Sequence, residues 1–140
     1  PKETKNSLIK ATESTSQNTG LILNLALSYG SRSEIRQAVV NIAQKIKSGL
    51  LLPDQIDEKI ISSHLQTSDL PDPDLIIRTS GEYRISNFLL WQIAYSEILV
   101  TNTLWPDFRK IEILSAIENY LNRERRFGMV TEQIEAARTF

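Results

Sequence analysis

The first strong hydrophobic signal in the chain is an apolar run of strand length at residues 21–27. It reads Leu-Ile-Leu-Asn-Leu-Ala-Leu, so apolar side chains fall on both faces of an extended chain. Such runs are typical of strands that are covered on both faces in a parallel sheet. Residues 5–18, before the run, are rich in Lys, Ser, Thr and Glu and suit an exposed helix that ends before Gly20. The sequence therefore predicts a surface helix followed by a buried strand.

A loop and an amphipathic helix are expected next. Ser31 and Glu34 have the spacing of a capping box, which would begin a helix at that point. Apolar side chains then recur at helical spacing, at Ile35, Val39, Ile42, Ala43 and Ile46. Gly49 supplies the stop for this helix. A second amphipathic stretch covers residues 55–65.

The second half of the chain continues the alternation. The Pro-Asp-Pro-Asp sequence at residues 71–74 predicts an extended or turned connector, and a buried strand is expected over residues 74–79. Residues 86–95 carry bulky hydrophobic side chains too densely for a surface helix, so we expect a helix packed in the interior. The short apolar run at residues 98–101 predicts a further strand.

The last predicted helix has apolar positions between residues 111 and 121, and Gly128 stands just beyond its end. Strands that alternate with helices indicate an α/β fold with a parallel sheet. We expect one domain over residues 1–140, long enough to bury roughly two thirds of its unfolded surface.

Composition excludes several classes of function. A formal net charge of −1 argues against non-specific nucleic-acid binding, and the lack of cysteine excludes disulfides, thiolate metal sites and a cysteine nucleophile. The chain has no apolar run of roughly 18 residues and begins with a polar segment, so we expect neither a membrane span nor a signal peptide. It begins with Pro1 rather than Met, from which we expect a processed or partial sequence.

Candidate chemistry is concentrated at residues 78–88, which hold two arginines, four hydroxyl side chains and a glycine. Arginine offers a planar fork of donors, and glycine lets backbone amides turn toward an anion, so this composition favours a diphosphate site. Arg78 would end a strand and Arg84 would follow the loop, at the sheet edge where ligands bind in open α/β folds. Ser86 fits as the N-cap of the next helix. The alternative is that both arginines pair with surface carboxylates.

Glu97 is the second candidate, because it lies between two apolar segments where an unpaired carboxylate would be costly. Spacing favours a salt bridge with Arg78 or Arg84, and a Mg²⁺ ion shared with substrate phosphates is the alternative. His64 is the only histidine and is interpreted as a surface or capping residue, which excludes Ser-His-Asp chemistry. Neither a P-loop nor a G-x-G-x-x-G motif occurs.

Four ordered blocks closely resemble the cis-prenyltransferase family, above all undecaprenyl diphosphate synthase. They are residues 73–92 (PDLIIRTSGEYRISNFLLWQ), 94–97 (AYSE), 104–108 (LWPDF) and 123–128 (RERRFG). Residues 23–32 resemble the preceding strand and loop of the family, with Ser31 where a second glycine is usual. The family's amino-terminal block, a Met-Asp-Gly-Asn-Gly-Arg-Trp-like loop with an essential aspartate, has no counterpart here. The resemblance therefore implies an incomplete undecaprenyl diphosphate synthase-like fold.

The resemblance also implies an enzyme that condenses isopentenyl diphosphate with an allylic prenyl diphosphate, using Mg²⁺, in a homodimer. It assigns the diphosphate of isopentenyl diphosphate to Arg78, Arg84, Ile85 and Ser86 and the metal to Glu97. Supporting or dimer-site positions are Glu82, Trp105, Asp107, Arg126 and Gly128.

Several expectations follow from the incomplete match. The chain would hold the isopentenyl half of the site and lack the allylic half, and by itself we expect it to be inactive. Two alternatives remain: a non-catalytic partner subunit of a heteromeric cis-prenyltransferase, and a phosphate-binding module without chemistry. The expected location is the cytoplasm, with peripheral membrane contact through the product and no nucleic-acid partner.

Overall fold

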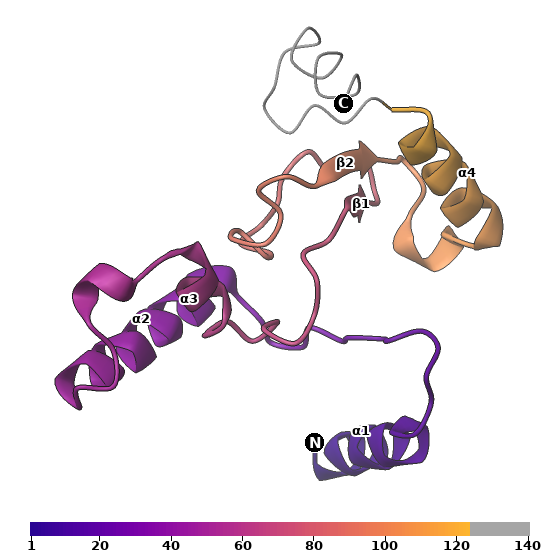
Figure 1. Ribbon diagram of the computed structural model, residues 1–140. Helices are drawn as coiled ribbons and strands as arrows, with labels where there is room; N and C mark the ends of the chain where they lie inside the picture. The colour runs from indigo at the N-terminus through magenta and orange to yellow at the C-terminus, as the bar shows by residue number, and fades with distance from the viewer. Residues whose placement is uncertain (124–140) are drawn as a thin grey trace, which may run out of the picture.

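The computed structural model describes residues 1–123 of the chain (Figure 1). The helices are α1 (Lys2–Thr15), α2 (Ser31–Lys47), α3 (Glu58–Ser62) and α4 (Lys110–Leu121). The strands are β1 (Leu75–Arg78) and β2 (Glu97–Val100), and two short 3-10 turns are η1 (Pro53–Gln55) and η2 (Trp105–Asp107). No helix within the described part of the chain is both long and apolar enough to cross a membrane.

Strands β1 and β2 pair in parallel and form the sheet of the described residues. Leu75 lies opposite Glu97, and Arg78 lies opposite Val100. The ladder continues beyond the strands, because the Thr101 amide donates to the Arg78 carbonyl at 2.9 Å. The predicted strands at residues 74–79 and 98–101 are thus confirmed, as is the α/β class with a parallel sheet.

The helix predicted after residue 31 is also confirmed, but its start differs from the prediction. Gly30 is the N-cap of α2, and Ser31 and Glu34 lie inside its first turn. The capping box is therefore wrong: both residues are almost fully buried and bond to other segments of the chain. The predicted stop is correct. Gly49 has φ of +72°, and the amides of Gly49 and Leu50 bond back into the last turn, which is a Schellman motif.

Two predicted elements do not form. Residues 21–27 run as an open chain between α1 and α2 (Figure 1), and no strand within residues 1–123 pairs with them. The interior helix predicted at residues 86–95 is a series of turns. Ser86, Asn87 and Leu89 have positive φ angles of 52°, 62° and 47°, which a right-handed helix does not allow. Ser86 consequently caps no helix.

The packed part of the protein lies where α2, the α3 region and the turns at residues 86–93 meet. Its buried side chains include Ala38, Ile42, Leu65 and Ile93. The Trp91 indole N–H donates to the Ser62 hydroxyl at 3.0 Å and ties the turns to α3. In contrast, α1 lies apart from the sheet in Figure 1 and has no buried residue, as expected for an exposed helix.

Candidate functional site

The two arginines of the predicted diphosphate site share one cavity of about 440 Å³ beside the parallel sheet, which we call the rim cavity. Arg78 ends β1, and Arg84 follows in the loop after it. The other lining residues come from both strands, this loop and the turns: Ile76, Ile77, Glu82, Tyr83, Ile85, Phe88, Ile93, Ile98 and Val100. The structure therefore brings Arg78, Arg84, Ile85 and Glu82 together around one concavity with apolar walls.

The turn between the two arginines is built by the residues that follow β1. Ser80 and Gly81 have φ angles of +66° and +64°, which reverse the direction of the chain. Their amides donate to the carbonyls of Thr103 and Thr101 at 2.9 and 2.8 Å, so the turn is tied to the segment after β2. A Cβ at residue 81 would lie 2.8 Å from the Asn102 side-chain oxygen. The positive φ angle favours glycine at this position, and a Cβ there would also have to displace the end of the Asn102 side chain.

Arg78 has an unsatisfied donor. Its Nε is buried and has no hydrogen-bond partner among the described residues. A buried guanidinium nitrogen without a partner is unfavourable, because it has lost water without gaining an acceptor. An anion in the rim cavity would supply the charged acceptor that such a donor favours.

Arg84 is in a different situation. Its guanidinium forms an ion pair with Glu82, and its side chain is 66% exposed. This contact agrees with the alternative that an arginine of the loop pairs with a surface carboxylate. Exposed ion pairs contribute little to stability, so a more highly charged anion could replace Glu82 at small cost.

Ser86 does not line the rim cavity. It lies in a smaller pocket, of about 280 Å³, with Arg32, Asn87 and Leu90, and Ile85 lines both pockets. The amides of Ser31 and Arg32 donate to the backbone and side-chain oxygens of Asn87, each at 2.9 Å. The start of α2 thus holds the loop that carries Arg84 and Ser86.

Glu97 is paired with an arginine, but not with one of the two predicted partners. Its carboxylate accepts a hydrogen bond from Arg123 Nη1 at 2.9 Å, and the same nitrogen donates to the Ile98 carbonyl at 3.1 Å. The predicted bridge to Arg78 or Arg84 is wrong, because the register places Glu97 opposite Leu75, three residues before Arg78. That separation is about 10 Å along a strand.

A magnesium site is not complete within residues 1–123. No group of three or more His, Asp or Glu side chains there is placed to hold a metal ion. Glu97 offers one carboxylate, already engaged by Arg123. Among the described residues Glu97 could therefore supply one carboxylate ligand to a Mg²⁺ ion that also binds substrate phosphates and water, and its role as a ligand stays a prediction.

The remaining predicted positions lie away from the rim cavity or outside the described residues. Trp105 and Asp107 belong to η2, and the Trp105 ring stacks on Phe108 with centroids 6.3 Å apart. Neither lines the rim cavity. Arg126 and Gly128 lie outside the described residues. His64 bonds through Nδ1 to the Ile60 carbonyl in α3, which is the capping role expected of it.

Sequence reasoning missed a buried polar cluster behind the site, formed by Ser31, Glu34 and Gln92, which we call the polar junction. The Glu34 carboxylate accepts from the Tyr29 hydroxyl at 2.5 Å, the Gln66 amide at 2.9 Å and the Gln92 side chain at 3.2 Å. Ser31 accepts from the Leu90 amide at 2.9 Å. Burial, together with the hydrogen bond to Glu34, raises the pKa of Tyr29.

The sequence did contain a signal for Glu34. It lies four and eight residues before Ala38 and Ile42, which are both buried, so it occupies the inward face of α2. A carboxylate on that face needs partners from other segments. The polar junction supplies them and joins α2 to residues 66 and 86–92.

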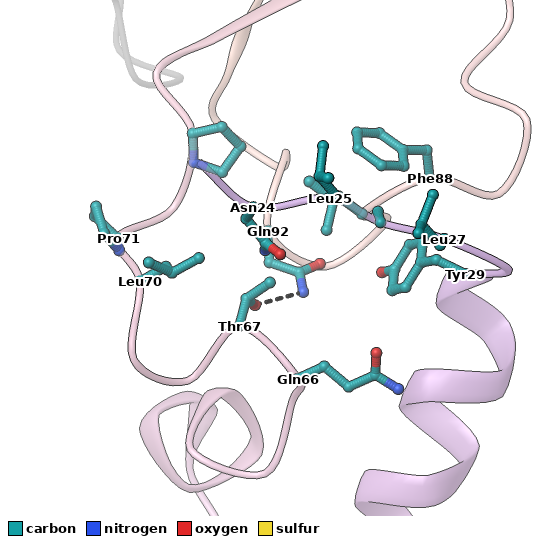
Figure 2. Close-up of a pocket in the computed structure, with 13 residues that line it drawn as sticks. Asn24, Leu25, Leu27, Tyr29, Gln66, Thr67, Leu70, Pro71, Phe88 and Gln92 are labelled. Carbon is teal, nitrogen blue, oxygen red and sulfur yellow. Dashed lines mark hydrogen bonds between the residues drawn. The ribbon is translucent and has the colours of Figure 1, made fainter. Parts of the chain in front are cut away.

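A second cavity, of about 330 Å³, lies beside the polar junction (Figure 2). Leu25 and Leu27 contribute apolar side chains from residues 21–27, which we call the open segment, and Gln92 and Thr67 form a hydrogen bond of 2.9 Å at the wall of the cavity. The Gln92 side-chain oxygen is buried and has no partner among the described residues. This cavity is mixed in polarity and carries no arginine.

The arrangement of a parallel sheet with two arginines around a cavity at its rim agrees with the sequence comparisons. Residues 1–128 match the family model described as putative undecaprenyl diphosphate synthase. The chain therefore belongs to this family of prenyltransferases.

Individual relatives are similar to the chain over nearly all of its length. It is 52% identical to an isoprenyl transferase of Chlorobaculum tepidum over 135 residues, which are 96% of this chain and 51% of the relative. It is 55% identical to an isoprenyl transferase of Geobacillus kaustophilus over 131 residues, which are 94% of this chain and 51% of the relative. The chain spans about half the length of these relatives.

Solved structures confirm the fold. Lavandulyl diphosphate synthase from Lavandula x intermedia, in complex with dimethylallyl diphosphate, is similar with a TM-score of 0.87 and 39% identity over 91% of this chain and 55% of that one. A probable undecaprenyl diphosphate synthase from Campylobacter jejuni is similar with a TM-score of 0.73 and 35% identity over 91% of this chain and 57% of that one. The predicted undecaprenyl diphosphate synthase-like fold, present in part, is thus confirmed.

Proposed function

We propose that the chain is the carboxyl-terminal part of a cis-prenyltransferase that condenses isopentenyl diphosphate with an allylic prenyl diphosphate. The observation that carries the proposal is the rim cavity, which Arg78 and Arg84 both line and where the buried Arg78 Nε has no partner among the described residues. Membership in the family, and relatives named isoprenyl transferase, support the reaction class.

In this proposal the two arginines bind and orient the diphosphate of isopentenyl diphosphate. Two guanidiniums can share its negative charge, and Arg84 exchanges Glu82 for a phosphate oxygen. The apolar side chains of Ile77, Ile98 and Val100 in the same cavity suit the five-carbon chain. Binding by both ends holds the double bond of the substrate in one orientation, which lowers the entropic part of the barrier.

The reaction requires the allylic C–O bond to break while the isopentenyl double bond attacks the allylic carbon. A new C–C bond forms, the allylic diphosphate leaves with the bonding pair, and a proton is lost from the isopentenyl unit. Negative charge grows on the leaving diphosphate, so groups that stabilise it accelerate the step. In this proposal the described residues bind isopentenyl diphosphate, and groups outside them bind the allylic diphosphate.

The proposal includes a Mg²⁺ ion with the Glu97 carboxylate as one of its ligands. Magnesium uses one or two carboxylates together with substrate phosphates and water, and when bound it would neutralise diphosphate charge. Glu97 would have to release Arg123, and further oxygen ligands would have to come from outside the described residues. Assembly as a homodimer and membrane contact through a long prenyl product are also part of the proposal.

The test joins this chain behind the amino-terminal half of the isoprenyl transferase of Geobacillus kaustophilus, giving a fused protein. We expect radiolabelled isopentenyl diphosphate to enter a butanol-extractable product in the presence of farnesyl diphosphate and Mg²⁺, and EDTA to abolish this incorporation. We expect no product from the chain alone. A folded fused protein that incorporates no label would contradict the proposal.

A further inference from the structure

Asn87 joins the loop of the rim cavity to the start of α2. Its backbone carbonyl accepts a hydrogen bond from the Ser31 amide, and its side-chain Oδ1 accepts one from the Arg32 amide, each at 2.9 Å. The first amides of a helix have no acceptor within the helix and need one from elsewhere. Gly30, the N-cap residue of α2, has no side chain that could supply it. Asn87 therefore caps α2 from a position 55 residues beyond Arg32.

Glycine at residue 30 leaves room for this contact. The backbone of Gly30 is extended, with φ of −158°, so its angles do not require glycine. A Cβ there would lie 2.9 Å from the Asn87 side-chain nitrogen, and among the described residues Asn87 is the one group, apart from the chain neighbours, within 4 Å of it. The Asn87 side chain thus packs directly against Gly30.

Residues 82–88, which we call the cavity loop, change direction at Ser86 and Asn87. These two residues have φ angles of 52° and 62°, in the left-handed region that residues other than glycine rarely adopt. Asparagine tolerates this region better than most residues, but two such residues in succession persist only where surrounding bonds hold them. The bonds from Asn87 to α2 hold one side of the turn, and a bond of 3.2 Å from the Phe88 amide to the Ile85 carbonyl closes it.

Asn87 lies between residues that line the rim cavity and does not line it itself. Arg84, Ile85 and Phe88 line the rim cavity, whereas Asn87 lines the smaller pocket beside it. Any effect of Asn87 on a ligand in the rim cavity must therefore pass through the backbone of the cavity loop. Arg84 depends on this backbone, because its guanidinium pairs with Glu82 of the same loop and not with the sheet or a helix.

We propose that Asn87 is a positioning residue of the isopentenyl diphosphate site. It holds the cavity loop against α2, and with it Arg84 and Ile85, in the conformation that binds the substrate. A loop that is ordered before binding loses less entropy when the ligand arrives, so the tie to α2 favours binding. The inference rests on the proposed function and adds to it a residue that touches no reacting atom.

The test measures steady-state kinetics in the fused protein, together with equilibrium titration of isopentenyl diphosphate in the absence of farnesyl diphosphate. Asn87→Ala removes the oxygen that accepts from the Arg32 amide. We expect the KM and the Kd for isopentenyl diphosphate to rise about ten-fold, which corresponds to the loss of roughly one hydrogen bond. The kcat and the KM for farnesyl diphosphate should change less than about two-fold, because a loss of uniform binding raises the KM of one substrate alone.

Asn41→Ala is the matched control. Asn41 lies on α2, its side chain accepts a hydrogen bond from the Gln37 side chain at 3.0 Å, and it lines neither the rim cavity nor the smaller pocket. This variant also loses one asparagine acceptor, and we expect both KM values and the Kd to stay at those of the parent fused protein.

A double variant separates positioning from helix capping. Gly30→Ser combined with Asn87→Ala places a serine at the N-cap of α2, in the extended backbone that such caps adopt, and the side chain that would obstruct its Cβ is absent. We expect the urea midpoint lowered by Asn87→Ala to return toward that of the parent, while the KM for isopentenyl diphosphate stays raised about ten-fold. Serine restores the cap of the helix but not its tie to the cavity loop. If Asn87→Ala alone does not fold, the double variant carries the comparison.

Each outcome decides the inference. A KM that recovers together with the urea midpoint in the double variant would show that Asn87 only caps α2, and would overturn it. An unchanged Kd in Asn87→Ala, beside a parent that binds isopentenyl diphosphate, would overturn it as well. A parent that binds isopentenyl diphosphate but makes no product, with a Kd raised in Asn87→Ala, would support the inference and contradict only the proposed reaction. A folded parent that does not bind isopentenyl diphosphate would contradict both.

Discussion

The polar junction and the open segment show opposite relations between residue type and burial. Glu34 is 2% exposed although it is a carboxylate, while Leu21 is 93% exposed although it is among the most apolar residues. Glu34 has three hydrogen-bond donors, whereas the one backbone hydrogen bond of residues 21–27 among the described residues joins the Leu27 amide to the Leu25 carbonyl. The difference teaches that in these two regions the available partners decide burial more than hydrophobicity does.

The largest effect is expected at the polar junction. Glu34→Ala leaves the Tyr29 hydroxyl, the Gln66 amide and the Gln92 side chain without their acceptor. We expect a loss of about 4 kcal/mol in the free energy of unfolding, since each buried unsatisfied donor costs about 1 to 3 kcal/mol. Urea unfolding followed by tryptophan fluorescence measures it. Glu34→Gln keeps an oxygen acceptor and should lose about half as much; equal stability of Glu34→Ala and the parent protein would refute the role of the polar junction.

A matched pair of leucines tests the comparison directly. Leu65 is 4% exposed and Leu23 is 75% exposed. Leu65→Ala should cost about 3 kcal/mol, because it leaves a cavity in the packed region, whereas Leu23→Ala should change the free energy of unfolding by less than about 0.5 kcal/mol. If both variants unfold alike in urea, the packed region and the open segment do not differ as the structure describes.

The contrast explains which elements could be predicted from sequence. The strands at residues 75–78 and 97–100 and the helix ending before Gly49 were predictable, because each has a local pattern and its partners lie within the described residues. The apolar pattern of residues 21–27 predicts a covered strand, but pairing depends on a neighbour that pattern alone does not reveal. The turns at residues 86–95 are dense in hydrophobic residues, and only the tertiary bonds to Ser31 and Arg32 show why they are not helical.

The candidate site was predictable in part for a similar reason. Arg78 was expected at the end of a strand and Arg84 after the loop that follows it, and both line the rim cavity. This expectation needed only local sequence. The partner of Glu97 was not predictable, since Arg123 lies 26 residues further along the chain and meets it only through the fold. Glu34 was predicted to take part in a capping box because of its spacing from Ser31. That spacing does not reveal that the Glu34 side chain is buried.

Burial also distinguishes the two arginines of the rim cavity. Arg78 has a buried Nε without a partner, and Arg84 is largely exposed and paired with Glu82. In the fused protein, Arg78→Ala should raise the KM for isopentenyl diphosphate about a hundred-fold and Arg84→Ala about ten-fold, because charge-assisted bonds are stronger where water is excluded. Arg36→Ala, an exposed arginine on α2, is the control. An unchanged KM in both cavity variants would remove the arginines from the site.

The smallest expected effect concerns Tyr29, at the boundary between the open segment and the polar junction. Its hydroxyl donates to Glu34, and burial together with that carboxylate raises its pKa above the ordinary value of 10.0. A raised folded-state pKa means that the stabilisation is complete below pH 10 and is lost as the pH rises through the folded-state pKa. Tyr29→Phe should therefore cost about 1 kcal/mol at neutral pH and flatten the fall in stability above pH 10.

Urea unfolding of Tyr29→Phe and the parent protein at neutral and at alkaline pH measures both parts of this prediction. Tyr83→Phe is the matched control, because Tyr83 is 88% exposed and should leave the pH profile unchanged. Parallel profiles for the parent and Tyr29→Phe up to the most alkaline point would show that the Glu34 carboxylate does not hold the Tyr29 proton. Tyr29 would then contribute nothing to the stability of the polar junction, as we expect for the residues of the open segment.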